Sequence, residues 1–98
     1  MNSIFKYKLD GMADKQIVKL PDNAKILSVQ YQKGELWLWA FIVKDQPKID
    51  RVIRIFGTGN DIERAYMQMR YIGTVQQGVF VWHVFEDMIT GRLTEKKE

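Results

Sequence analysis

The segment Glu35–Val43, ELWLWAFIV, constrains the fold of this chain more than any other. As a β-strand it sends alternate side chains to two faces: Leu36, Leu38, Ala40 and Ile42 to one, and Trp37, Trp39, Phe41 and Val43 to the other. Both faces are apolar, whereas a strand with one solvated face normally alternates apolar and polar residues. The segment therefore predicts a strand inside a sandwich or barrel, or a strand whose tryptophan face is a binding or oligomer surface.

The composition is that of one small folded domain. A chain of 98 residues is too short for two independent cores, and hydrophobic and charged contents of 46% and 28% are ordinary for a globular protein. The absence of cysteine excludes disulfides and thiolate metal sites. No apolar segment approaches the roughly 20 residues of a membrane-spanning helix. Lys6 and Lys8 stand where a secretory signal would be apolar, so we expect a protein of the cytoplasm.

The charge pattern does not by itself indicate nucleic-acid binding. The net charge is +3, from 15 Lys and Arg against 12 Asp and Glu, and no run of basic residues is longer than two. Proteins that bind nucleic acid usually gather their basic residues on one face. The excess of positive charge here is mild.

Turn residues divide the chain into short alternating segments. Strands are predicted over residues 4–9, 16–20, 25–32, 35–43, 51–56, 71–75 and 79–85. Leu27, Val29 and Tyr31 are expected to point inward. One short helix is predicted over residues 61–69, because Asn60 or Asp61 can cap it and apolar residues recur there at helical spacing.

Short strands with a turn every eight to twelve residues or so indicate a mainly β fold, an antiparallel sandwich or small barrel of six to seven strands with one short helix. The alternative is an α+β fold. Residues 1–86 are expected to form a single β-rich domain and 87–98 a charged tail. Residues 36–43 and 79–85 are apolar on both faces, so we expect both strands to be central and adjacent.

So small a chain has limited means to cover two such strands, and we therefore expect a homo-oligomer or a partner chain. The interface is expected to contain the large aromatic residues of these strands, Trp37, Trp39, Phe41 and Trp82. The same rings offer an alternative function, a stacking platform for single-stranded nucleic acid. Core or interface is favoured, because almost no basic residues are interleaved on the strands that carry the tryptophans.

The sequence Gly57-Thr58-Gly59-Asn60 is the best candidate for a ligand site. Backbone amides, the threonine hydroxyl and the start of the predicted helix would hold a phosphate or carboxylate, with Arg54 and Arg64 adding charge. The pattern is too short for a P-loop or a dinucleotide motif. Glycines that let the chain turn into a capped helix explain it equally well, and the turn is favoured.

Catalytic and metal chemistry find little support in the sequence. His83 is the only histidine, and Glu86 falls on the opposite face of the same strand. We interpret His83 as a hydrogen-bonded structural residue. One histidine without cysteines cannot build a typical zinc site, and we find neither an activated nucleophile nor a cofactor motif. We therefore expect no enzyme, no cofactor and no metal.

Five segments occur together in this chain: LPDNAKILSVQ at 20–30, LWLWAFIV at 36–43, RIFGTGN at 54–60, YIGT at 71–74 and FVWHVFE at 80–86. In this combination the chain resembles a family of short, uncharacterised phage and prophage proteins. The likeness covers nearly all of residues 4–86. The chain departs from it at Asn60, where similar members have histidine, and in a longer insert at residues 62–70.

The resemblance implies a phage-borne accessory protein, and small proteins of that kind often block a host system by binding. We therefore expect a non-enzymatic protein that counteracts a host defence system, in the manner of an anti-CRISPR protein. Its expected partner is a host protein or a small anionic ligand such as a nucleotide. A module that binds single-stranded nucleic acid is the alternative.

Overall fold

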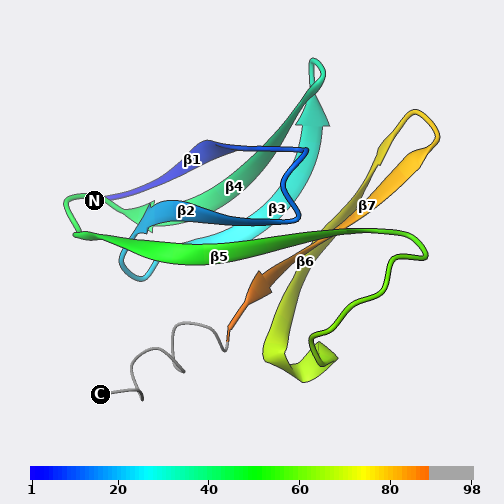
Figure 1. Ribbon diagram of the computed structural model, residues 1–98. Coiled ribbons are helices and arrows are strands. Elements are labelled where there is room, and N and C mark those ends of the chain that lie inside the picture. Colours follow the sequence, from blue (N-terminus) through cyan, green and yellow to red (C-terminus); the bar gives the residue numbers. More distant parts are fainter. Residues whose placement is uncertain (89–98) are drawn as a thin grey trace.

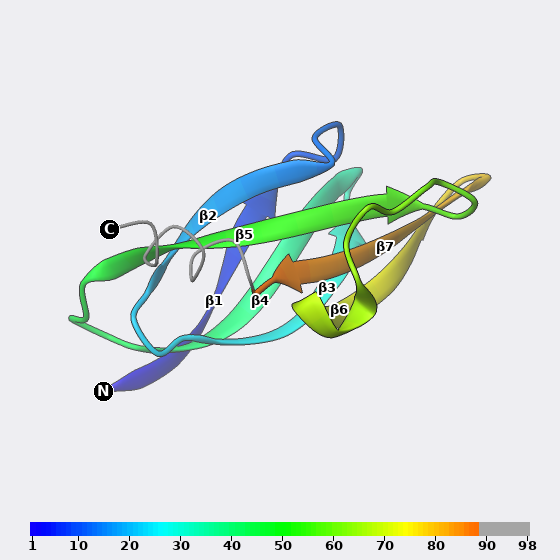
Figure 2. The ribbon, with the colours of Figure 1, turned by 60° about the horizontal axis from the view of Figure 1, so that its bottom comes forward.

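The computed structural model describes residues 1–88, which form two antiparallel sheets packed face to face (Figures 1 and 2). Its strands are β1 (Asn2–Leu9), β2 (Lys15–Pro21), β3 (Lys25–Gln32), β4 (Glu35–Val43), β5 (Lys48–Gly57), β6 (Met69–Gln77) and β7 (Phe80–Asp87). One sheet has the order β1-β4-β3 and the other β2-β5-β7-β6. The predicted mainly β fold, an antiparallel sandwich, is confirmed.

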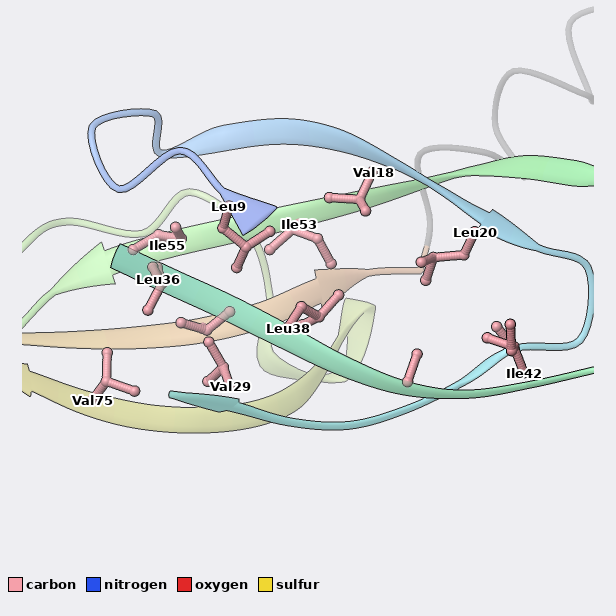
Figure 3. Packing of buried hydrophobic residues seen from close by; sticks show 13 residues of the cluster. Leu9, Val18, Leu20, Val29, Leu36, Leu38, Ile42, Ile53, Ile55 and Val75 are labelled. Atoms are coloured by element: carbon pink, nitrogen blue, oxygen red, sulfur yellow. The ribbon is translucent and has the colours of Figure 1, made fainter. Parts of the chain in front are cut away.

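The core lies between the sheets and is built from the inward faces of both (Figure 3). On β4 the predicted inward row is almost completely buried, with Leu38 and Ala40 at 0% exposure. Ile53 of β5 and Val84 of β7, also at 0%, belong to the same cluster on the facing sheet. On β4, alternation therefore selected the core residues, as the period of two requires.

The two strands that are apolar on both faces are central, as predicted, but they are not adjacent. β4 lies between β1 and β3, and β7 lies between β5 and β6 in the other sheet. Each pairs with the strand that precedes it in a short hairpin, β3 with β4 and β6 with β7. These local hairpins occupy one edge of each strand, and β1 and β5 occupy the other edges.

Two bulges modify the predicted alternation. In β3 the register shifts between Ile26 and Ser28, so that Leu27 is 44% exposed while Ile26 packs against the core. The expectation that Leu27 points inward is therefore wrong. In β6 the register shifts between Tyr71 and Gly73, at the point where this strand approaches β3.

The predicted helix over residues 61–69 does not form. Residues 61–65 have no regular secondary structure, a single 3-10 turn η1 covers Tyr66–Gln68, and β6 begins at Met69. The segment crosses the outer face of β5 and β7 (Figure 2), where the Tyr66 and Phe85 rings meet edge to face. A helix of this length is marginal by itself, so contacts with the sheet decide the conformation.

The predicted boundary between domain and tail falls inside the last strand. Asp87, assigned to the tail, is the last residue of β7 and is buried. The rest of the predicted tail, residues 89–98, lies outside the described part of the chain. Within residues 1–88, no helix has the length and apolar character needed to cross a membrane.

Candidate functional site

Three of the four predicted interface residues share one outward surface. Trp37, Trp39 and Phe41 of β4 point away from the core, the two tryptophans half-buried and Phe41 40% exposed. Ile4 of β1 lies opposite Phe41 and is 55% exposed. We call this outer side of the three-stranded sheet the tryptophan face, comprising Ile4, Lys6, Lys8, Lys25, Trp37, Trp39 and Phe41.

Lysines from the neighbouring strands flank the aromatic row. In the sheet register, Lys8 lies opposite Trp37 and Lys6 opposite Trp39, both from β1. The Lys6 Nζ lies 4.2 Å from the centre of the Trp37 ring and 6.0 Å from that of Trp39, which are cation–π contacts. Lys25 of β3 lies opposite Phe41.

Sequence reasoning missed these lysines, since it looked for basic residues on the strands that carry the tryptophans. The available signal was the alternation of residues 4–9, in which Lys6 and Lys8 share one face. That signal acquires meaning only once β1 is known to pair with β4.

Trp82, the fourth predicted interface residue, is not part of this surface. It lies on β7 in the other sheet, packs against the core cluster and stacks on Phe80, with ring centres 5.7 Å apart. Its Nε1 donates a hydrogen bond to the Gln77 side chain at 3.2 Å. Trp82, Phe80 and Asn60 line a cleft of about 330 Å³ next to the loop between β1 and β2.

The Gly57–Asn60 segment is a hydrogen-bonded turn. The Asn60 amide donates to the Gly57 carbonyl at 3.0 Å, and the Thr58 amide donates to Val81 of β7 at 3.3 Å. Gly59 has a φ of +91°, which favours glycine. No α-helix follows, so the positive helix end on which the anion-site hypothesis partly depended is absent from the described chain. The segment therefore has the geometry of a turn, which the sequence favoured over an anion-binding loop.

The two arginines proposed to assist an anion are engaged by carboxylates of the chain itself. Arg54 is buried and binds Glu63 through Nη2 at 2.8 Å, with Nη1 at 3.6 Å from Asp87. Arg64 binds Asp87 at 2.8 Å. The hydrogen bond from Arg54 is the main cause that lowers the pKa of Glu63. An incoming anion would compete with these carboxylates.

His83 is hydrogen-bonded at both ring nitrogens, as predicted for a hydrogen-bonded residue. Its Nε2 lies 2.7 Å from the Thr58 hydroxyl and its Nδ1 lies 3.1 Å from that of Thr74. The Thr74 hydroxyl lies 2.5 Å from that of Tyr71. The network fastens the Gly57–Asn60 turn to β6 and β7. Within residues 1–88, no three His, Asp or Glu side chains are placed to hold a metal ion.

The fold is that of a small antiparallel β-sandwich domain that carries a row of aromatic residues on one outer face. The chain belongs to the family described as a domain of unknown function, DUF7352, whose model matches residues 1–92. No curated protein and no solved structure matches the chain.

Proposed function

We propose that this chain is a non-enzymatic accessory binding protein of phage or prophage origin. It acts in the host cytoplasm and counteracts a host defence system by occupying a host macromolecule with its tryptophan face. The exposed aromatic row supports the binding role, and the resemblance in five segments supports the phage origin.

The observation that carries the proposal is the row of three large rings, Trp37, Trp39 and Phe41, on the outer face of β4. The outer face of β5 and β7 is covered by residues 61–68, with Tyr66 on Phe85 and salt bridges from Glu63 and Arg64. The tryptophan face keeps Phe41 and Ile4 exposed at 40% and 55%. Tryptophan and phenylalanine are enriched at protein interfaces, and contiguous exposed apolar patches mark interaction sites. The tryptophan face is therefore where we place the partner.

A macromolecule is a better-supported partner than a small anionic ligand. Arg54 and Arg64 would have supplied the charge for a small anion, and both are held by Glu63 and Asp87. A flat sheet face offers a macromolecule an extended contact area, whereas small ligands prefer concave sites. A dimer in light scattering would instead identify a second copy of the chain as the occupant.

A defence assay tests the proposal. The wild-type chain, expressed in a host with an active defence system, should restore phage growth. The double variant Trp37→Ser/Trp39→Ser should not. Ile17→Ser is the matched control, because Ile17 is 60% exposed on the outer face of the other sheet.

The same three proteins, tagged, should differ in capture from host extract. Wild type and Ile17→Ser should retain one host macromolecule that the double variant loses. The proposal would fall if phage growth did not depend on the tryptophans. It would also fall if the wild type had no effect in any host tested. Circular dichroism should show the double variant to be folded, since both rings lie outside the core.

A further inference from the structure

We infer that the macromolecule bound by the tryptophan face is a single-stranded nucleic acid. The inference rests on the proposed function, because it names the partner of the same face. Two observations carry it: the sign of the flanking charges and the succession of rings along β4.

The charges beside the rings are mainly positive. Lys6 and Lys25 flank the aromatic row, and Lys33 lies in the turn between β3 and β4. A hollow of about 550 Å³ next to Trp37 is lined by Lys6 and Lys33. Glu35 lines it too but forms a salt bridge with Lys8 at 3.3 Å. Three lysines are thus positioned around the rings to meet phosphates.

The rings follow each other at a spacing that suits unstacked bases. Trp37, Trp39 and Phe41 are every second residue of β4, so the backbone positions that carry the rings are about 6.8 Å apart along the strand. This is roughly twice the 3.4 Å rise of a stacked nucleic-acid strand. An extended single strand can therefore place one base on each ring, as in proteins that bind single strands by stacking.

The contact between Lys6 and Trp37 does not block such stacking. An exposed cation–π contact is weaker than a base stacked on an aromatic ring. Lys6 can exchange the ring for a phosphate while a base takes its place. A duplex would keep its bases stacked on each other and could not use the rings, so single strands are favoured over double strands.

Fluorescence anisotropy with labelled oligo(dT) and oligo(U) of about 12 nucleotides tests the inference. The full-length protein should bind these single strands more tightly than a duplex of equal length. Three lysine–phosphate contacts predict a salt slope of about −2, or roughly a 20-fold loss of affinity between about 50 and 200 mM salt. A polyglutamate peptide serves as the acidic polypeptide probe and should not compete.

Variants separate the two components of binding. Trp39→Ala should weaken binding at least about tenfold with little change in the salt slope, because stacking releases few counterions. Lys25→Gln should reduce the slope by about 0.7. Lys19→Gln is the control, since Lys19 pairs with Asp50 on the other sheet and should leave both quantities unchanged.

Absence of oligonucleotide binding by the wild type would overturn the inference, as would equal effects of Lys25→Gln and Lys19→Gln. If oligonucleotides fail but loss of the tryptophans still abolishes the defence phenotype, the partner is a protein and only this inference falls. If oligonucleotides bind but no defence phenotype depends on the tryptophans, the proposed function falls instead.

Discussion

Arg51 of β5 and Glu86 of β7, neighbouring strands of the four-stranded sheet, form a two-pronged ion pair. The Arg51 Nη2 lies 3.0 Å from one carboxylate oxygen of Glu86, and its Nε donates to the other. The Arg51 Nη1 also donates to the carbonyl of Ala24 at 2.9 Å. The Glu86 side chain is 4% exposed and that of Arg51 13%. The pair therefore adds a charge-assisted link from β5 to β7 beside the apolar core.

Glu86→Gln should destabilise the fold by about 3 kcal/mol, because it leaves the buried Arg51 charge without its counter-ion. Urea unfolding followed by circular dichroism measures the change. The double variant Arg51→Met/Glu86→Leu removes both charges together and should recover most of the loss. A Glu86→Gln protein as stable as wild type would show that the pair is not tightly coupled.

The two faces of β4 should respond differently to truncation. Leu38→Ala removes a side chain at 0% exposure and should cost about 2–5 kcal/mol. Phe41→Ala removes one that is 40% exposed on the tryptophan face and should cost less than about 1 kcal/mol. Thermal unfolding of the two variants tests this. An equal loss of stability in the two variants would indicate that Phe41 is buried in an assembly, and so favour an obligate oligomer.

Gly73 lies where β6 approaches β3, and alanine should not fit there. A Cβ at this position would lie 3.0 Å from Cγ1 of Val29, which is buried and has little room to move. Gly73→Ala should therefore destabilise the protein by about 1–3 kcal/mol. Gly11→Ala is the matched control, since its nearest neighbour would be the Tyr31 hydroxyl at 3.5 Å. Similar melting temperatures for the two variants would contradict the close approach.

Stability should decline in acid partly through Glu63. Arg54 holds the pKa of Glu63 in the folded chain below the ordinary value of 4.5. The unfolded chain therefore takes up the proton first as the pH falls. The contribution of ionised Glu63 to the stability of the fold is complete above about pH 4.5. It is lost as the pH falls through the pKa of Glu63 in the folded chain. Glu63 is 69% exposed in its side chain, so solvent screening keeps the effect small.

Glu63→Gln should remove this component. Melting temperatures from pH 7 down to about pH 3 should show a shallower acid decline for the variant than for wild type. Asp50→Asn is the control, because Asp50 pairs with the exposed Lys19 on the same sheet. Parallel curves for wild type and Glu63→Gln would mean that the contact with Arg54 adds nothing to folding.

The strands could be predicted because their signal is local. Residues 25–32 and 35–43 were delimited correctly by alternation and by the glycine at the intervening turn. The conformation of residues 61–68 could not be predicted in this way, and a helix was wrongly expected there. It depends on Arg54, Phe85 and Asp87, which lie elsewhere in the sequence. The bulge at Leu27 likewise follows from pairing with β4 and has no clear sign in residues 25–32.

The candidate site was predictable in part for the same reason. The aromatic row on β4 follows from the period of a single strand. The pairing of Arg54 and Arg64 with Asp87 could not be predicted from the sequence pattern. Asp87 was assigned to a tail, whereas it is buried at the end of β7. Continuing the alternation of His83 and Phe85 by one more step would have placed Asp87 on the same face as Arg54.

The amino-acid sequence by itself determined which residues form strands, which side chains of β4 enter the core, and that large rings point the other way. Those properties depend on neighbours along the chain and on a side-chain period of two. Only the tertiary structure decided that Lys6 meets Trp37, that β4 and β7 belong to different sheets, and that residues 61–68 cover one outer face but not the other. Such contacts join residues far apart in the sequence. They are brought together by the order of strands in each sheet, which no local pattern encodes.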